Sequence, residues 1–308
     1  MMTRVVFMGS PEFAVPSLRA LTREYTVVGV VTQPDRPAGR GRTLKPPAIK
    51  VEASALGLPT IQPNKLTETS AVQQIRDWAP EVIVVAAFGQ ILRPETLRLP
   101  ARGCINVHAS LLPRWRGAAP IQAAIAAGDT ESGVTIMQMD EELDTGPMIS
   151  QRRVPIEPQD TGGSLAERLA RLGAELLPVA LRGYLSGSLV PQPQDAAAAT
   201  KAPLLKKEDG RLDPVMPARV LERRVRAFNP WPGAYILLDE GNLKVHRAHV
   251  VTAEHPPGMR LTVDGKPALG TVQGVLVLDE VQPAGKKPMS GQDFLLGARG
   301  WRQDARLS

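Results

Sequence analysis

The sequence predicts an α/β domain with a mostly parallel sheet, followed by a small β-barrel domain. In the first half, short apolar runs alternate with stretches of helical periodicity, which is typical of βαβ units. Around 190–200 the composition changes to Pro, Gln and Ala, as in a linker. Beyond it, short β-type runs separated by Gly and Pro indicate a barrel. We therefore expect a first domain over 1–189, a linker over 190–207 and a barrel over 208–308.

The composition limits the classes of function. The chain has 308 residues, of which 43% are hydrophobic and 22% charged, as in globular proteins. Its single Cys excludes a disulfide framework and a Cys-based zinc site. We find no basic-then-apolar leader and no apolar run near the roughly 18 residues that cross a bilayer, so we expect a cytoplasmic protein with no membrane partner. The net charge of +6 favours a polyanionic partner.

The chain opens with a predicted βαβ unit. We expect strands over 4–8 and 26–32, with a helix between them that ends near Tyr25. The dinucleotide fingerprint Gly-x-Gly-x-x-Gly is missing, because only Gly9 stands at the first turn. A nicotinamide enzyme is therefore the least favoured function.

A long basic segment, Gln33–Lys50, follows this unit and is predicted to be a non-periodic loop. Its Pro and Gly residues disfavour a helix or a central strand. One acid, Asp35, stands against five basic residues, which are Arg36, Arg40, Arg42, Lys45 and Lys50. Because Arg pairs with phosphate through two hydrogen bonds, we interpret the loop as a phosphate contact. The alternative is a solvated, mobile loop.

The remaining elements continue the two patterns. In the first domain we expect helices ending near Leu56 and over 68–78, a buried strand over 81–87, a helix over 120–127 ended by Gly128, strands over 133–139 and 148–155, and a long helix over 164–184 that Pro178 kinks. After the linker we expect a helix over 212–228 and strands over 234–238, 243–250, 260–263 and 274–281.

Asn106 and His108 lie on a further predicted strand, which begins at Cys104. Side chains alternate along a strand, so both point the same way at the end where ligands bind in open α/β sheets. An amide can hold a developing oxyanion while an imidazole moves a proton, which suits chemistry at a carbonyl. The alternative for His108 is a structural role. We expect Cys104 to be a small buried residue rather than a nucleophile.

Asp144 belongs to an acidic segment, Asp140–Gly146, that follows another predicted strand. We interpret it as the partner of the imidazole, holding its tautomer and favouring its protonated form. The triplet Asp-Thr-Gly also matches an aspartic-protease signature, but the chain has no second copy to supply the paired carboxylate. A metal site built from these acids and His108 is an alternative; acidic loop residues are more often only solvated.

The segment Asn106–Pro120 carries the most specific motif, and on it the chain resembles the methionyl-tRNA formyltransferase family. The resemblance covers essentially all 308 residues. Supporting stretches are 32–42, 133–140, 143–146, 226–232 and 282–287. The Asn, His, Ser-Leu-Leu-Pro and Asp-Thr-Gly residues are shared by formyl-tetrahydrofolate transferases of this fold in general, whereas the basic loop and the C-terminal half indicate the tRNA enzyme.

The resemblance implies a Rossmann-like catalytic domain and an OB-like barrel that contacts tRNA. The implied reaction moves a formyl group from 10-formyltetrahydrofolate, the donor co-substrate, to the α-amine of methionine on initiator tRNA, with no metal and by a monomer. The implied catalytic residues are Asn106, His108 and Asp144. Folate-binding segments match Phe88, Gly89, Ser110, Leu111, Leu112 and Pro113. We assign tRNA contacts to Arg36, Arg40, Arg42, Lys45, Lys206 and Lys207, with Arg42 the strongest candidate.

Other functions stay open from the sequence. The same fold can formylate an amino-sugar nucleotide or hydrolyse formyltetrahydrofolate. A different class is a non-catalytic RNA-binding module, in which Arg114, Trp115 and Arg116 stack on RNA and pair with it.

Overall fold

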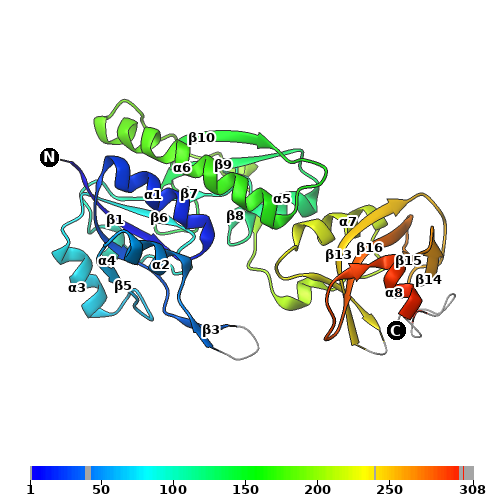
Figure 1. Ribbon diagram of the computed structural model, residues 1–308. Helices are drawn as coiled ribbons and strands as arrows, with labels where there is room; N and C mark the ends of the chain where they lie inside the picture. Colours follow the sequence, from blue (N-terminus) through cyan, green and yellow to red (C-terminus); the bar gives the residue numbers. More distant parts are fainter. Residues whose placement is uncertain (1, 39–42, 239–240, 298–300, 302–308) are drawn as a thin grey trace. The chain divides into compact units, whose positions relative to one another are not determined.

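The structure is a computed structural model that describes residues 2–38, 43–238, 241–297 and 301 (Figure 1). The chain forms two compact units. The first comprises Met1–Gly117, Ser132–Val154 and Ala166–Lys201, and the second Ala118–Glu131, Pro155–Leu165 and Ala202–Ser308. Two short stretches that lie before residue 166 thus belong to the second unit. The boundaries at 189 and 207 stay predictions. Within the described ranges, no helix is long and apolar enough to cross a membrane.

A seven-stranded sheet forms the centre of the first unit. Its strands lie in the order β10 (Met148–Pro155), β9 (Glu131–Gln138), β7 (Cys104–His108), β6 (Val82–Ala86), β1 (Arg4–Gly9), β2 (Thr26–Val31) and β5 (Thr60–Ile61). Pairing is parallel from β5 through to β7, and β9 is antiparallel to β7. The predicted mostly parallel sheet is confirmed.

The register of β6 and β7 determines where the site can form. Val85 pairs with Asn106 in parallel, so the chain leaves both strands at the same edge of the sheet. Every residue of β6 is buried, as the continuous apolar run predicts. The turn after β6 and the loop after β7 therefore begin side by side, and these two segments carry the predicted folate-binding residues.

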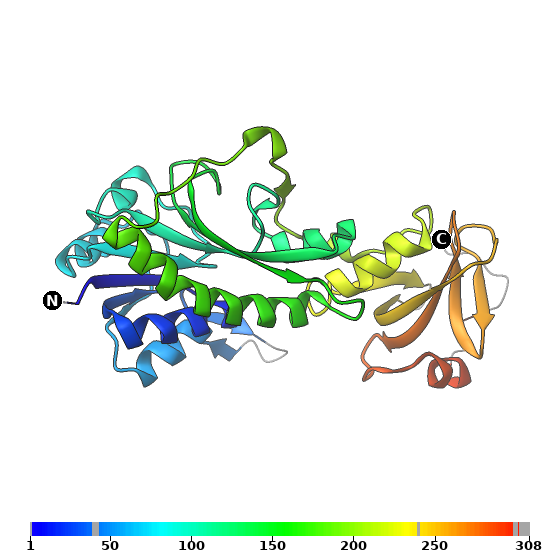
Figure 2. The same cartoon turned by 90° about the horizontal axis from the view of Figure 1, so that it is seen from above.

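Helices cover both faces of this sheet. Helices α1 (Val15–Glu24) and α6 (Gly162–Ser186) lie on one face, and α3 (Thr69–Asp77) lies on the other (Figure 2). On the α6 face, a Cβ added at Gly173 would stand 2.9 Å from Val107 Cγ1. On the α3 face, Ile75 and Cys104 belong to one buried cluster. The α3 face is thus the one on which the strand parity also puts Asn106 and His108.

Shorter elements complete the first unit. They are 3₁₀ turns over Glu12–Ala14 and Ala196–Ala198, helices α2 (Ala48–Ala55) and α4 (Pro94–Leu97), and strands β3 (Arg36–Ala38), β4 (Thr43–Lys45), β8 (Arg116–Gly117) and β11 (Lys201–Ala202), the last of which reaches into the second unit.

The prediction of a structureless loop over Gln33–Lys50 is wrong in part. Strands β3 and β4 pair antiparallel, with Arg36 opposite Lys45, and α2 already begins at Ala48. The Pro and Gly residues do exclude a central strand, but a short isolated hairpin needs few backbone donors. The prediction also missed the short elements β5 and α4.

The second unit contains a six-stranded antiparallel sheet. Its order is β12 (Ala234–Leu238), β13 (Gly241–Val251), β16 (Val275–Pro283), β15 (Lys266–Gly270) and β14 (Arg260–Val263), and β17 (Met289–Ser290) pairs with β16. Helices α5 (Pro120–Ala127), α7 (Ala218–Ala227) and α8 (Gly291–Gly297) and a 3₁₀ turn over Lys207–Gly210 accompany it. The small antiparallel β domain is confirmed.

The second unit also corrects one predicted boundary. The helix expected over 212–228 begins only at Ala218, after two prolines at 214 and 217. Proline restricts the residue before it to extended conformations, so a helix cannot run through this stretch without distortion. The apolar face of α7, with Leu221 and Val225, packs into the buried cluster of the sheet.

Candidate active site

The carboxylate of Asp144 lies where the three predicted catalytic side chains meet. Its Oδ1 atom accepts a hydrogen bond from Asn106 Nδ2 at 3.3 Å and lies 3.6 Å from His108 Nδ1. Its Oδ2 atom accepts from the backbone N–H of Gly117 at 2.8 Å. The side chains of His108 and Asp144 are 6% and 11% exposed. The fold thus brings together an amide and an imidazole from strand β7 and a carboxylate from the loop after β9.

The second ring nitrogen of His108 fixes the tautomer. His108 Nε2 lies 3.0 Å from the carbonyl oxygen of Trp115. A carbonyl can only accept, so Nε2 carries a hydrogen in both charge states of the ring. In the neutral ring the lone pair is then on Nδ1, which faces Asp144. The distance of 3.6 Å between Nδ1 and Asp144 Oδ1 is longer than an N–H···O hydrogen bond.

Asp144 and Trp115, neither of which is a glycine, have left-handed backbone conformations. Asp144 has φ of 56°, which an Asp side chain tolerates better than most. Trp115 has φ of 64°, which is unusual for a bulky residue and is a form of local strain. The N–H of Trp115 donates to Thr200 Oγ1 at 2.9 Å. This conformation directs the Trp115 carbonyl at His108, so the strained residue is the one that orients the ring.

Cys104 lies on the same strand face but is not reactive. Its side chain is 1% exposed, and burial raises the pKa of the thiol to about 12. The thiol is therefore protonated at neutral pH and is a poor nucleophile. The prediction of a small buried residue is confirmed.

The predicted folate-binding residues after β6 form a tight turn. Gly89 is exposed and has φ of 80°, a conformation that favours glycine. Phe88 is 2% exposed and belongs to the core cluster, so only its backbone could face a ligand. The Phe88 carbonyl already accepts from Ser10 Oγ and Gln33 Nε2, each at 3.2 Å.

The predicted folate-binding residues after β7 form a second turn, which hydrogen bonds to Arg114 and Thr135 stabilise. Ser110 is buried, and its hydroxyl donates to the Arg114 carbonyl at 2.6 Å. Thr135 Oγ1 donates to the Ser110 carbonyl at 2.7 Å and accepts from the Leu112 N–H at 3.2 Å. Leu112 is buried, whereas Leu111 and Pro113 are partly exposed. These last two residues are the part of the turn that a ligand can reach.

The predicted tRNA-contacting residues lie in separate places. Arg36 and Lys45 are exposed and face each other across the β3–β4 hairpin. Lys206 and Lys207 are exposed at the start of a 3₁₀ turn; Lys207 belongs to that turn in the second unit. Arg40 and Arg42 lie outside the described residues. Lys50 is a structural residue, because its ammonium group donates to both Asp35 oxygens, at 2.8 and 2.9 Å.

Asp140 and Glu141, two acidic residues near Asp144 in sequence, have partners of their own. Both carboxylate oxygens of Asp140 accept from Thr145 Oγ1, at 2.7 and 2.9 Å, and Glu141 forms an ion pair with Arg98 at 3.0 Å. Over the part of the chain that the structure describes, no group of three His, Cys, Asp or Glu residues is placed to hold a metal ion.

The sequence did not reveal the residues that hydrogen-bond to the loops of the site. Gln194 and Thr200 contact the loops of Asp144 and Trp115, and Gln151 donates to the Leu112 carbonyl at 2.6 Å. Gln194 and Thr200 lie in the segment predicted to be a linker. No local pattern could reveal them, because their partners are 50 and 85 residues away along the chain.

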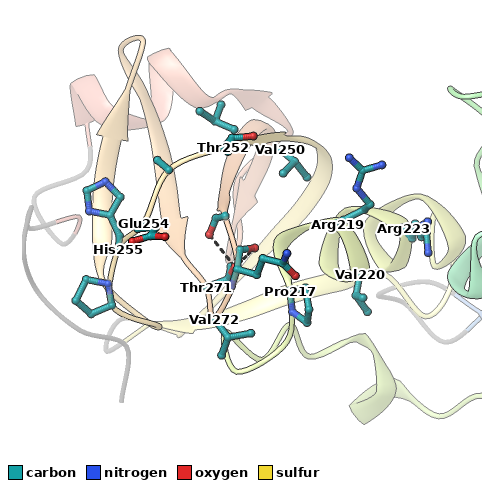
Figure 3. Close-up of a pocket in the computed structure, with 15 residues that line it drawn as sticks. Pro217, Arg219, Val220, Arg223, Val250, Thr252, Glu254, His255, Thr271 and Val272 are labelled. Carbon is teal, nitrogen blue, oxygen red and sulfur yellow. Dashed lines mark hydrogen bonds between the residues drawn. The ribbon is translucent and has the colours of Figure 1, made fainter.

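The second unit has an open groove of its own (Figure 3). Its walls are the start of α7, the segment after β13 and the turn before β16, with Arg219, His255 and Thr271 among the lining residues. None of the predicted catalytic or folate-binding residues lines this groove. The groove is therefore not the predicted active site.

Comparison with known proteins identifies the domain families to which the chain belongs. Residues 3–181 match the model of the formyl transferase family, and residues 204–299 match that of its C-terminal domain. Among solved structures, the N-formyltransferase from Helicobacter canadensis, in complex with folinic acid and dTDP-3-aminofucose, is 16% identical with a TM-score of 0.66, covering 90% of this chain and 99% of that one.

A second solved structure contains the same fold within a longer chain. HypX from Aquifex aeolicus, in complex with tetrahydrofolic acid, is 20% identical with a TM-score of 0.62. The match covers 99% of this chain and 49% of HypX, so this chain spans about half the length of that protein. At this level of identity, the two solved structures show the fold alone.

Sequence relatives are much closer. The methionyl-tRNA formyltransferase of Myxococcus xanthus is 51% identical over 96% of this chain and 95% of its own length. That of Xylella fastidiosa strain M12 is 49% identical over 96% of this chain and 98% of its own length. The chain therefore belongs to the methionyl-tRNA formyltransferase family of enzymes.

Proposed function

We propose that this enzyme transfers the formyl group of 10-formyltetrahydrofolate to the α-amine of methionine esterified to initiator tRNA, with Asn106, His108 and Asp144 as its catalytic residues. The observation that carries the proposal is the position of Asp144 Oδ1, which is 3.3 Å from Asn106 Nδ2 and 3.6 Å from His108 Nδ1. A single carboxylate thus orients an amide donor and balances the charge of a protonated imidazole.

The reaction itself is an acyl transfer between two nitrogens. The neutral methionyl amine attacks the formyl carbon, a new C–N bond forms, and the carbonyl oxygen becomes an oxyanion. Asn106 Nδ2 stabilises that oxyanion by a hydrogen bond, and the protonated His108 stabilises it by its charge. The bond between the formyl carbon and the folate nitrogen then breaks, and the proton lost by the amine passes to that nitrogen with the help of Asp144.

Two exposed turns at one sheet edge support a folate site next to this triad. Gly89 lies in the turn after β6, and Leu111 and Pro113 lie in the turn after β7, which runs beside it. Exposed backbone and small apolar surface suit a planar ligand that is recognised mostly by its hydrogen-bonding edge. The solved relatives from Helicobacter canadensis and Aquifex aeolicus are in complex with folinic acid and tetrahydrofolic acid, respectively.

The choice of acceptor rests on the close sequence relatives. Relatives that share 49–51% identity over 96% of the chain act on methionyl-tRNA. The sugar-formylating relative is only 16% identical. The exposed cations Arg36, Lys45, Lys206 and Lys207 fit a phosphate-rich acceptor, and Arg40 and Arg42 extend the same basic segment in the sequence.

The test is formyl incorporation into charged initiator tRNA from the folate donor, with elongator methionyl-tRNA and an amino-sugar nucleotide as competing acceptors. We expect initiator methionyl-tRNA to be the preferred acceptor. Asn106→Ala and His108→Ala should each lower kcat by roughly 100- to 1000-fold, because each removes a group that stabilises the oxyanion. His255→Ala, which changes an exposed His in the second unit, is the control and should retain full kcat.

Two results would contradict the proposal. Near-normal turnover by His108→Ala would remove the imidazole from the reaction. Binding of tRNA without any formyl transfer by the wild-type enzyme would favour the RNA-binding module instead.

A further inference from the structure

The segment between Gln192 and Thr200 contacts both the loop that carries Asp144 and the loop that runs from Trp115 to Gly117. At its start, Gln192 and Met148 exchange two backbone hydrogen bonds, of 2.7 and 2.8 Å, which tie the segment to the first residue of β10. At its end, the Thr200 carbonyl accepts from the Arg116 N–H at 2.9 Å. The segment is thus anchored at both ends to the unit that contains the catalytic triad.

Gln194 uses its whole side-chain amide between these anchors. Its Nε2 donates to the carbonyls of Asp144 and Gly146, at 2.9 and 2.7 Å, and its Oε1 accepts from Arg116 Nε at 3.0 Å. One half-buried amide therefore links the loop that carries Asp144 to the loop that runs from Trp115 to Gly117. The second of these loops supplies two backbone groups to the triad, the Trp115 carbonyl to His108 and the Gly117 N–H to Asp144.

The contact to the Asp144 carbonyl matters because of the backbone at that residue. With φ of 56°, Asp144 occupies a region of low population for residues other than glycine. Gly146 is also confined, since a Cβ there would stand 2.0 Å from the Gln138 carbonyl oxygen. Rotation of the peptide after Asp144 would turn its carbonyl away from Gln194 and move the carboxylate relative to Asn106 and His108.

From these contacts we infer that Gln194 is a positioning residue for formyl transfer, holding the backbone of Asp144 so that its carboxylate meets Asn106 and His108. This inference rests on the proposed role of Asp144. Gln194 touches neither the reacting atoms nor the triad side chains in this role. It acts through the two carbonyls that its Nε2 atom fixes.

The test distinguishes the hydrogen bonds that Gln194 Nε2 donates from the one that its Oε1 accepts. Gln194→Glu keeps an oxygen for Arg116 but cannot donate to the two carbonyls. Gln194→Met removes both polar atoms without adding a charge. We expect both variants to lower kcat by roughly 10- to 100-fold, to change the pH profile of kcat, and to leave KM for both substrates within about threefold.

Gln192→Glu is the matched control. The Gln192 side chain is exposed and donates only to the Val190 carbonyl, at 3.0 Å, so the same substitution in the same segment should leave kcat unchanged. Thermal unfolding of all variants is followed in parallel, and kcat is measured at least 15 °C below each midpoint. A loss in Gln194→Glu that is absent from Gln194→Met would overturn the inference.

A double-mutant cycle with Asp144→Asn distinguishes the inference from the proposed function. If Gln194 acts through Asp144, the double variant Asp144→Asn/Gln194→Glu is no slower than Asp144→Asn alone. Additive losses, or wild-type kcat in Gln194→Glu beside an inactive Asp144→Asn, would refute the positioning role only. Full activity of Asp144→Asn would refute the role of the carboxylate itself.

Discussion

At the scale of single residues, Cys104 is the sharpest test of which groups take part in the chemistry. It shares a strand face with Asn106 and His108, yet burial raises the pKa of its thiol to about 12. We predict that Cys104→Ala retains kcat within about twofold and loses roughly 1 kcal/mol of stability, because only packing is removed. Steady-state kinetics and thermal unfolding measure the two effects. A large drop in kcat without unfolding would assign chemistry to the thiol.

The same scale shows what local sequence can and cannot predict. Asn106 and His108 could be predicted to face the same way because strand alternation is a property of the backbone itself. The conformation of Trp115 could not, since φ of 64° is set by tertiary contacts such as the bond to Thr200. The contacts of Gln194 could not be predicted either, because its partners are distant in sequence and its neighbours along the chain resemble a linker.

At the scale of elements, the β3–β4 hairpin presents two exposed cations to solvent. Arg36 and Lys45 stand opposite each other, and Arg36 is held by Gln33 at 2.9 Å. We predict that the double variant Arg36→Ala/Lys45→Ala raises KM for methionyl-tRNA by roughly 10-fold, as expected for two lost phosphate contacts, and leaves KM for the folate donor unchanged. Initial rates with each substrate varied in turn measure both constants.

The control for the hairpin removes two positive charges from elsewhere in the same unit. Lys65 and Arg76 are exposed, in the loop before α3 and on α3. Lys65→Ala/Arg76→Ala should leave both KM values near those of the wild type. Equal effects of the two double variants on tRNA would mean that only net charge matters and that the hairpin has no particular role.

The β sheet of the second unit carries a pH-dependent ion-pair cluster. Asp279 on β16 accepts from Lys266 Nζ at 2.7 Å and His249 Nδ1 at 2.9 Å. Burial opposes ionisation of Asp279, but these hydrogen bonds outweigh it and lower the pKa of the carboxyl. The unfolded carboxyl therefore takes up a proton at a higher pH than the folded one, so this contribution to stability is present above about pH 4 and is lost below it.

We predict that Asp279→Asn lowers the melting temperature by about 2–4 °C at pH 7, which corresponds to roughly 1 kcal/mol. The difference from the wild type should shrink as the pH falls from 5 to 3, because the wild-type carboxyl then becomes protonated as well. Melting curves at several pH values measure it. Asp264→Asn, at the exposed turn between β14 and β15, should show no such pH-dependent gap. A gap that stays constant to pH 3 would contradict the role of the ion pairs.

How well the sequence predicts an element depends on the length and the pattern of that element. The apolar run of β6 follows from burial on two faces and was predicted as a buried strand, whereas β13 was predicted only as a β-type run over 243–250. Short elements such as β5 and β17 were missed, since two residues carry no detectable period. The predicted start of α7 was wrong because helical spacing of apolar residues continues upstream of Ala218, where the prolines prevent a helix.

At the scale of the whole molecule, the excess of positive charge has a measurable consequence. The net charge of +6 includes the predicted tRNA contacts in both halves of the sequence. If four phosphates are neutralised, the logarithm of the tRNA association constant should fall against the logarithm of salt concentration with a slope of about −3.6. A fourfold rise in salt then weakens binding by roughly 150-fold.

Equilibrium binding of labelled methionyl-tRNA between 50 and 200 mM salt measures that slope, and the folate donor gives the internal comparison. Each lost phosphate contact should reduce the slope by about 0.9, so Arg36→Ala/Lys45→Ala should lower it by about 1.8. This loss of slope distinguishes direct phosphate contacts from a shape change of the hairpin, which would weaken binding equally at every salt concentration. A wild-type slope near zero would mean that the enzyme recognises its tRNA without its excess charge.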